Sequence, residues 1–367
     1  MKRAYYIDLL RIFLTVLVFF HHSAIAFGGS GGWYYVSQTP TSGTIQGVLS
    51  LFMSIDQSYF MSLFFFISAL LMPISYDKKG FSRFLKERLV RLGIPLLVYT
   101  ALIHPTLVYW IHLYLDKTDA SWVSFVWMMD THYAEPGPMW FVLTLLFIET
   151  VYALYRRFFA GTLSKLLPDK LPSTAGIFLF MIVTGLLAYL IRMVCPVGTS
   201  FFGLQFGFFS LYIGMYFVGI LACRRNWMEQ LTLKGAIPWF SLSLICIPML
   251  MIATRTENVT PFLGGLNLSA LFYAMWEPVM CVGISYFLLA FSRKYFNRPN
   301  KFILILSGDS YTAYIIHPMV VVCCTFLVEQ LSISPLEKLA LLLVIGIPCC
   351  FAMSHLLRLI PGMKKVF

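Results

Sequence analysis

The sequence predicts an all-α, polytopic transmembrane helix bundle of about ten helices with both termini in the cytoplasm. Of its 367 residues, 59% are hydrophobic and 12% are charged, against roughly one-quarter charged residues in an ordinary soluble domain. Apolar runs of about 20 residues, long enough to cross a hydrocarbon core of about 30 Å, recur along the chain. Lipid offers no partner for unpaired backbone groups, and the runs lack the alternation of barrel strands, so helices are expected.

The expected spans follow one another with short polar loops between them. We find no internal repeat, low-complexity tract or separate soluble segment, so residues 1–367 are expected to form one integral-membrane domain. The spans cover residues 5–27, 44–74, 89–112, 137–158, 173–193, 204–223, 236–253, 265–291, 303–328 and 336–358.

Basic residues predict the orientation of these spans, because cytoplasmic loops are enriched in Lys and Arg. Only four of the 27 basic residues, Lys117, Arg192, Arg255 and Lys338, fall in the loops that are therefore expected outside. The net charge of +11 therefore reflects the basic loops that orient the spans in the membrane. We do not expect a nucleic acid partner. The segments expected inside, both termini included, hold Lys2, Arg3, Lys78, Lys79, Arg83, Lys86, Arg88, Arg91, Arg156, Arg157, Lys165, Lys170, Arg224, Arg225, Lys234, Arg293, Lys294, Arg298, Lys301, Arg358, Lys364 and Lys365.

No motif predicts a metal or a disulfide. Of the eight cysteines, only Cys195 falls in a loop expected outside, so a disulfide framework is not expected. No set of Cys and His residues has the spacing of metal ligands. Any chemistry must then come from side chains of the bundle itself.

The first span carries ionisable residues at membrane depth, where each costs several kcal/mol and marks a candidate functional site. At about 100° per residue, Arg11 and His22 lie within about 20° of one helix face, and Asp8 lies within about 60° of Arg11. His21 lies about a quarter-turn away, so we assign the chemistry to His22. For Asp8 we favour a simple ion pair with Arg11 at i, i+3. The alternative for His22 is a hydrogen bond to a neighbouring helix.

The loop after the first span contains a glycine-rich tract, residues 28–32, followed by Trp33, Tyr34 and Tyr35. Such a segment suits a re-entrant or sugar-stacking loop. An aromatic belt at the membrane interface is the simpler interpretation and the one we favour.

Six basic residues gather between Lys78 and Arg91, in the loop after the second span and at the start of the third, more than orientation requires. Such a cluster suits polyanions, either anionic lipid headgroups or the phosphates of a nucleotide cofactor. Arg83, Arg88 and Arg91 are the candidates for phosphate. Lipid contact explains Lys78 and Lys79 equally well.

Two carboxylates, Glu149 in the fourth span and Glu277 in the eighth, are expected to be buried. Either could orient a histidine, bind an acceptor hydroxyl or pair with an arginine, and spacing does not choose between these roles. We assign Glu149 to the catalytic group and Glu277 to the acceptor-lining group. Trp140 lies about 180° around the helix from Glu149 and is either an interface anchor or a ring that stacks on the acceptor.

The ninth span carries a second polar stripe. Ser310, Tyr314 and His317 share one face at i, i+4 and i+7, and Pro318 frees a backbone carbonyl beside the histidine. The stripe either lines the substrate site or forms a helix-packing seam of hydroxyl hydrogen bonds.

Four motifs occur in order along nearly the whole chain, each weak alone. The first is Asp8, Leu9 and Arg11, with His22 eleven residues after the arginine. The others are Phe64 to Ser68 followed by Arg83, Arg88, Arg91 and Pro95; Gly137-Pro138-Met139-Trp140-Phe141; and Ser310, Tyr311, Tyr314 and His317.

In this order the motifs resemble those of the acyltransferase-3 family of integral-membrane acyltransferases, and the chain is similar to enzymes that O-acetylate or succinylate bacterial surface glycans. The chain departs from the family's pattern at Ala69, where a glycine commonly follows the serine. This departure affects only the expected tightness of that turn. The resemblance implies an acetyl-CoA or succinyl-CoA donor, a sugar, glycan or lipid-linked acceptor, and a multi-pass protein of the bacterial inner membrane.

The resemblance also ties Arg11 and His22 most closely to activity. They are separated by about 16 Å along a helix, comparable with an extended phosphopantetheine arm. Acyl-CoA held by its phosphates at the cytoplasmic side, by Arg11 and the basic loop, would present its thioester near His22. His22 would then act as general base on the acceptor hydroxyl or accept the acyl group transiently.

The competing interpretation is a proton-coupled secondary transporter of a small polar or sugar-like solute, because ten helices with buried ionisable residues also describe such carriers. The ordered motifs and the lack of a visible repeat favour the acyltransferase.

Overall fold

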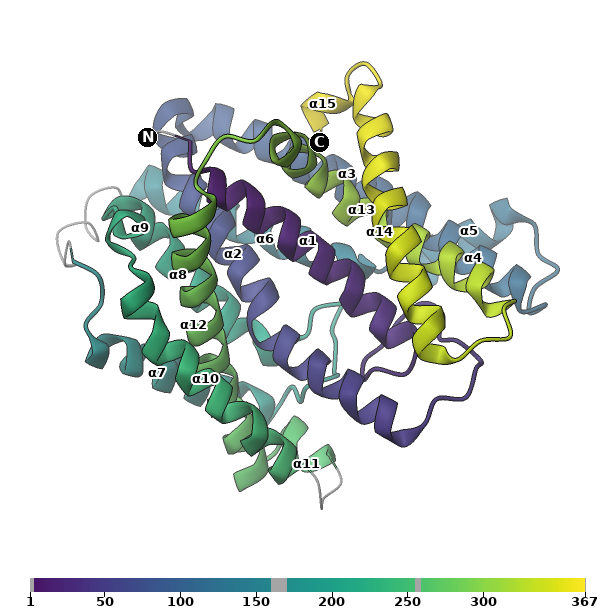
Figure 1. Cartoon of the computed structure of the whole chain (residues 1–367). Coiled ribbons are helices and arrows are strands. Elements are labelled where there is room, and N and C mark those ends of the chain that lie inside the picture. Colours follow the sequence, from purple (N-terminus) through teal and green to yellow (C-terminus); the bar gives the residue numbers. More distant parts are fainter. Residues whose placement is uncertain (1–2, 160–169, 255–258, 367) are drawn as a thin grey trace. The chain divides into compact units, whose positions relative to one another are not determined.

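The computed structural model describes residues 3–159, 170–254 and 259–366, and within them the chain is helical without a β-strand (Figure 1). The all-α prediction is therefore confirmed. Three basic residues used to predict orientation, Lys2, Lys165 and Arg255, lie outside these ranges. The helices are α1 (Tyr5–Ala26), α2 (Gly43–Arg88), η1 (Leu89–Gly93), α3 (Ile94–Val98), η2 (Tyr99–Ile103), α4 (His104–Tyr114), α5 (Trp122–His132), η3 (Gly137–Met139), α6 (Trp140–Phe158), α7 (Thr174–Arg192), η4 (Phe206–Phe208), α8 (Phe209–Arg224), α9 (Trp227–Gln230), α10 (Leu233–Ala253), α11 (Thr260–Leu263), α12 (Leu268–Phe296), α13 (Lys301–Glu329), α14 (Pro335–Leu359) and α15 (Met363–Val366).

Nine helical runs in the described part of the chain are long and apolar enough to cross a membrane. Eight of them each match one expected span, and the ninth, Gly43–Tyr114, contains both of the expected spans 44–74 and 89–112. Gly80 leaves helical geometry within this run, with φ of +70°, a conformation that glycine adopts without the cost other residues incur. The ten expected spans therefore appear as nine runs, one of which turns at Gly80.

Polar residues directly before the apolar runs fix where several helices begin. Each accepts a hydrogen bond from a backbone N–H of the first turn, which stabilises the helix by about 0.5–2 kcal/mol. At α14, Ser334 and Glu337 form a reciprocal capping box around Pro335. The other caps of this kind on long helices are Ser42, Ser173, Thr232 and Asn267.

The chain divides into two compact units. Unit 1 consists of Met1–Arg11, Ser54–Phe84 and Glu149–Asn300. Within it, α12 packs against α7 and α10 (Figure 1). Glycines permit this close approach, since a Cβ on Gly283 of α12 would lie 1.8 Å from Ser243 Oγ of α10.

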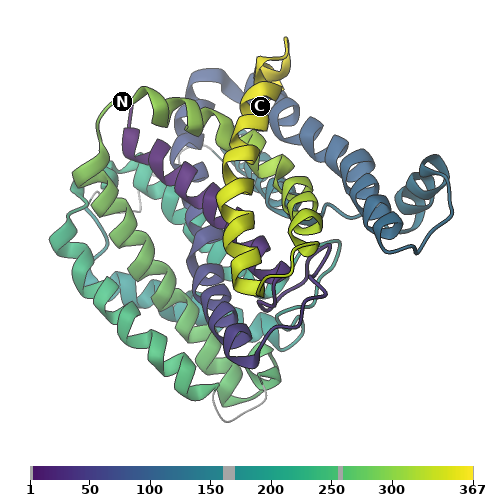
Figure 2. The ribbon, with the colours of Figure 1, turned by 45° about the vertical axis from the view of Figure 1, so that its right-hand side comes forward.

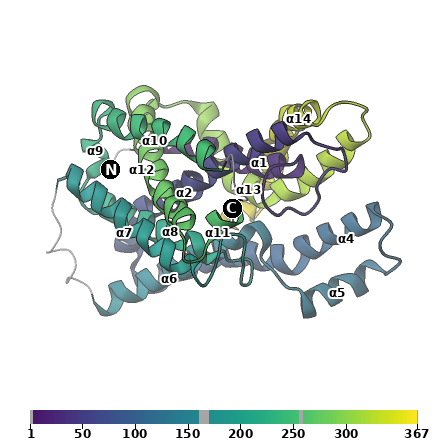
Figure 3. The same ribbon diagram turned by 90° about the horizontal axis from the view of Figure 1, so that it is seen from below.

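Unit 2 consists of Ile12–Met53, Leu85–Ile148 and Lys301–Phe367. Here α13 and α14 lie side by side, yellow-green and yellow in Figure 2, and α4 lies beside α5 (Figure 3). Gly346 of α14 lets α1 approach, because a Cβ there would lie 2.6 Å from Phe19. Unit 2 thus brings the second half of α1 against the last two long helices.

Orientation in the membrane stays a prediction that cysteine labelling can test. In a background without reactive native cysteines, Ser30→Cys and Thr118→Cys are expected to react with an impermeant maleimide added outside intact cells. Lys79→Cys and Asn297→Cys are expected to react only after the membrane is permeabilised. External labelling of Lys79→Cys would reverse the assigned orientation.

Candidate active site

His22 on α1 and His317 on α13 face each other in unit 2. His317 Nε2 lies 3.0 Å from His22 Nδ1, and the two rings stack with centroids 4.9 Å apart. His317 is buried, whereas His22 is partly exposed. The sequence assigned them to separate groups, one catalytic and one acceptor-lining, and the structure joins them in a pair.

The proton positions in this pair follow from Pro318. Proline has no N–H, so the Tyr314 carbonyl four residues earlier loses its helical partner, as the sequence predicted. His317 Nδ1 lies 2.5 Å from this carbonyl, which can only accept, so Nδ1 carries the proton and Nε2 of the neutral ring accepts. His22 Nδ1 must then donate, and the network assigns a lone pair to His22 Nε2.

Trp33 covers the histidine pair. Its ring stacks on His22 with centroids 4.0 Å apart and planes 20° apart, and it lies 6.0 Å from the His317 ring. Stacking occupies the face of the His22 imidazole and leaves Nε2, on the ring edge, uncovered by the indole. The sequence favoured a membrane-interface role for this tryptophan, and the loop instead places it against the candidate base.

Tyr34, the next residue, enters a separate polar group. Its hydroxyl lies 2.7 Å from His104 Nδ1 and 3.0 Å from the Tyr99 hydroxyl. Burial raises the pKa of Tyr34, so this hydroxyl stays neutral near pH 7 and serves as a hydrogen-bonding anchor. Sequence analysis gave no role to Tyr99 or His104, because nothing local marks them as partners of Tyr34.

The polar stripe of α13 separates into different roles. The Ser310 hydroxyl donates to the Leu306 carbonyl of its own helix at 2.9 Å. The Tyr314 hydroxyl donates to the carbonyl of Pro138, in the turn before α6. Only His317 reaches a partner that bears on proton transfer. The Tyr314 contact suits the packing seam that the sequence left as an alternative, and the substrate-lining role of the stripe stays a prediction.

Trp140 and Glu149, two of the predicted site residues, both belong to α6. Trp140 is the first residue of α6 and is partly buried, with its ring edge-on to Phe141. Glu149, which belongs to unit 1, is 1% exposed. Its assignment to the catalytic group stays a prediction.

Glu277 takes one of the roles left open, the pairing with an arginine. Its Oε2 accepts from Arg192 Nη2 at 2.5 Å, and the Arg192 side chain is 0% exposed. Glu277 also lines a small cavity of unit 1 with Gln57 and Ser210. Sequence analysis missed this pair because Arg192 was counted as an external loop residue, although its place at the end of an apolar span was a usable signal.

Asp8 and Arg11 form the predicted i, i+3 ion pair in unit 1, at 3.9 Å. Asp8 is buried and also accepts from Arg3 Nε at 2.8 Å. The Arg11 side chain stays about one-third exposed, at 34%. It thus remains accessible to a polyanion.

Of the three arginines assigned to phosphate, Arg83 belongs to unit 1, whereas Arg88 and Arg91 belong to unit 2. Arg83 and Arg91 are exposed and Arg88 is half-buried. The Tyr311 hydroxyl donates to the Arg91 carbonyl at 2.8 Å, so α13 holds the end of the basic segment.

A further charged group in unit 2 was missed. Asp309, 1% exposed on α13, accepts from Arg358 Nη1 at 2.5 Å and contacts His355 Nδ1 at 3.0 Å, both on α14. Gly308 makes room for it, since a Cβ there would lie 2.7 Å from Arg358 Nη1. A lone acid beside a glycine in an apolar span was the available signal.

Comparison with known families gives a match over nearly the whole chain. The family model described as an acyltransferase domain, acyltransferase-3, matches residues 4–355, which include the histidine pair and most of both units. A search of curated proteins found no match. Because the family model spans nearly the whole chain, this multi-pass helical protein belongs to the acyltransferase-3 family.

Proposed function

We propose that this protein is a membrane-embedded O-acyltransferase that moves an acetyl or succinyl group from cytoplasmic acyl-CoA to a hydroxyl of a sugar, glycan or lipid-linked acceptor, in the bacterial inner membrane. The observation that carries the proposal is the His22–His317 pair, whose hydrogen bonds assign a lone pair to His22 Nε2. Such a nitrogen is the group that a hydroxyl nucleophile needs as general base.

The reaction uses that lone pair directly. His22 Nε2 takes the proton of the acceptor hydroxyl while the hydroxyl oxygen attacks the thioester carbonyl carbon. The carbon–sulfur bond then breaks, and the CoA thiolate receives the proton from His22. While His22 is protonated, its Nδ1–H keeps donating to His317 Nε2, so the pair holds the imidazolium in place. A positioned base of this kind contributes about 10²–10⁴ in rate.

The basic segment of unit 2 supports binding of the donor by its phosphates. Tyr311 contacts the Arg91 backbone and His317 contacts His22. These two α13 residues are six positions apart, about 9 Å along the helix axis. Phosphates at Arg88 and Arg91 would then leave the phosphopantetheine arm to extend along α13 towards the histidines. The assignment of Arg11 and Arg83 to the same phosphates stays a prediction.

Donor binding can be measured without knowing the acceptor. Arg91→Ala and Arg11→Ala, in purified protein, are each expected to weaken acetyl-CoA or succinyl-CoA binding by about tenfold or more, since a hydrogen bond to a charged group contributes about 1.5–3 kcal/mol. The matched control is Lys234→Ala, an exposed basic residue expected to lie on the same side of the membrane. Isothermal titration calorimetry gives the dissociation constants, and thermal unfolding checks the fold.

The same experiment separates the proposal from a transporter. Binding of a sugar-like solute with no detectable acyl-CoA binding by the wild-type protein would favour the carrier. The acceptor itself can be found by mass spectrometry of surface glycans and lipids from cells carrying the wild-type or the His22→Ala gene. An acylated species that requires His22 identifies it.

A further inference from the structure

The loop that carries Trp33 is folded back onto the end of α1 by glycines. Gly28 and Gly31 have φ of +106° and +135°, values that side chains other than glycine rarely adopt. The Gly29 N–H donates to the Ala24 carbonyl at 2.8 Å, and a Cβ on Gly31 would lie 2.9 Å from Ile25 Cδ1. The glycine tract therefore returns the chain over the last turns of α1, where His22 lies.

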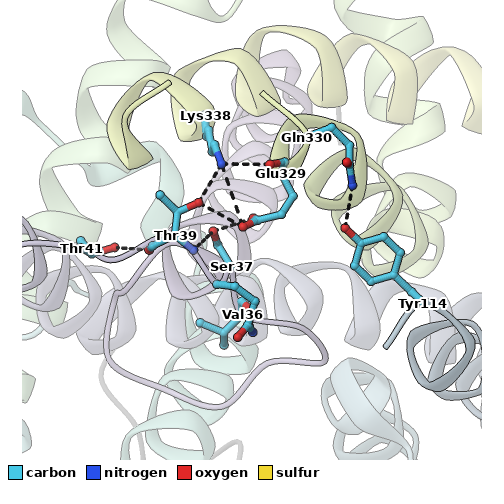
Figure 4. Close-up of polar contacts among 9 residues, drawn as sticks. Val36, Ser37, Thr39, Thr41, Tyr114, Glu329, Gln330 and Lys338 are labelled. Carbon is cyan, nitrogen blue, oxygen red and sulfur yellow. Dashed lines mark hydrogen bonds and ion pairs between the residues drawn. The ribbon is translucent and has the colours of Figure 1, made fainter. Parts of the chain in front are cut away.

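Ser37, Thr39, Glu329 and Lys338 form a group that we call the polar latch (Figure 4). It joins the second half of this loop to the end of α13 and the start of α14. Glu329 accepts from the hydroxyls of Ser37 at 2.6 Å and Thr39 at 3.0 Å. Lys338 Nζ donates to Thr39 Oγ1 at 2.7 Å and to the Glu329 carbonyl at 3.2 Å. Lys338 is 3% exposed. Hydrogen bonds in which one partner is charged are among the stronger hydrogen bonds in proteins.

The residues that follow Trp33 are anchored as well. Tyr34 bonds to Tyr99 and His104, and Tyr35 is buried in an apolar cluster with Leu107, Ile111 and Val322. The glycine tract therefore holds the chain before Trp33, and Tyr34, Tyr35 and the polar latch hold the chain after it. A ring held this firmly beside a candidate base is positioned for chemistry.

The indole N–H of Trp33 lacks a hydrogen-bond partner among the described residues, although its nitrogen is buried. Buried tryptophan N–H groups usually find an acceptor, and a buried donor without a hydrogen bond costs about 1–3 kcal/mol of stability. The donor belongs to the ring that stacks directly on His22. An acceptor supplied by a bound substrate would remove this cost at the place where the acyl group must react.

We propose that Trp33 is a catalytic residue whose Nε1–H donates to the carbonyl oxygen of the acyl group; this inference rests on the proposed acyltransferase function. When the acceptor oxygen bonds to the carbonyl carbon, the C=O electron pair moves onto that oxygen, and the indole N–H stabilises the negative charge. The pair returns to re-form C=O as the carbon–sulfur bond breaks, and Trp33 keeps its proton throughout. Donors preorganised for such an oxyanion act most strongly where water is excluded.

The decisive variant is Trp33→Phe, which keeps an aromatic ring over His22 and removes the N–H together with part of the indole. We expect kcat to fall about 10²–10³-fold, as for loss of one oxyanion donor, whereas acetyl-CoA binding should weaken by at most about tenfold, the loss of one neutral hydrogen bond. Trp127→Phe is the matched control, because Trp127 of α5 is 73% exposed. This variant should keep full activity. Wild-type kcat in Trp33→Phe would overturn the proposal, as would a rise in KM with kcat unchanged.

A binding measurement tests the same hydrogen bond without turnover. S-ethyl-CoA has a methylene group where acetyl-CoA has its carbonyl, so it offers no acceptor to the indole. The wild-type protein should bind acetyl-CoA about three- to tenfold more tightly than S-ethyl-CoA, the range of one neutral hydrogen bond. Trp33→Phe should bind both equally. Equal binding by the wild type would contradict the proposal even if the variant failed to fold.

The two proposals fail in different ways. If the wild type transfers no acyl group and binds no acyl-CoA, the acyltransferase function fails. If the wild type transfers, His22→Ala is inactive and Trp33→Phe is fully active, only the role of Trp33 fails.

Discussion

Replacing His22 with alanine is expected to lower acyl transfer about 10²–10⁴-fold, the usual cost of a positioned general base. The hydrogen bonds assign the free lone pair to His22 Nε2, and His317 is turned towards the Tyr314 carbonyl and so offers no free nitrogen of its own. Acyl-CoA binding should change little, because the phosphates are proposed to bind at arginine side chains and not at His22. The measurement is release of free CoA or mass gain of the acceptor, per molecule of membrane-located protein.

His21→Ala is the control for this substitution. His21 is buried at 8% exposure and meets the His22 ring edge-on at 5.4 Å. Its loss should cost stability and yield, as core substitutions do, while turnover per folded molecule is largely kept. Equal activity of His22→Ala and wild type would remove the base from the mechanism. An inactive His21 variant beside an active His22 variant would place the chemistry on the other face of α1.

The helices and the face of α1 on which His22 lies were predictable because both follow from local sequence. Apolar runs fix which segments cross a membrane, and a fixed turn per residue sets which face His22 occupies. Pro318 was equally informative, since a missing N–H frees one particular carbonyl, and the structure shows His317 bonded to it. These features depend on neighbours within a few residues.

The partners were not predictable, because they depend on how helices pack. Arg192 and Glu277 are 85 positions apart, and His22 and His317 are 295 apart. Periodicity shows that each such side chain faces the bundle interior. It does not show which residue of another helix the side chain contacts. The contact of Trp33 with His22 was missed for the same reason: an aromatic residue after a span suits the interface, and the folded glycine tract is what brings this ring onto His22.

The buried ion pair of unit 1 leads to the second large expected effect. Arg192→Ala should destabilise the protein by about 3–5 kcal/mol, because it leaves the Glu277 carboxylate buried without compensation. The guanidinium also donates to the Gly207 carbonyl at 3.0 Å and lies over the Phe208 and Tyr273 rings, so further contacts are lost. Glu277→Gln should cost a similar amount, since it leaves the Arg192 charge buried.

The double variant Arg192→Met with Glu277→Leu separates charge from packing. Replacing both members of a buried pair with apolar residues of similar size is often neutral or stabilising, so it should recover most of the loss. The surface pair of Arg224 with Asp77, 36% and 42% exposed in the same unit, is the matched control, and Arg224→Ala should cost at most about 1 kcal/mol. Thermal unfolding of the purified variants ranks all four. A mild effect of both Arg192→Ala and Glu277→Gln would show that the cavity beside Glu277 admits enough water to solvate either charge, and that the pair does not hold α7 and α12 together.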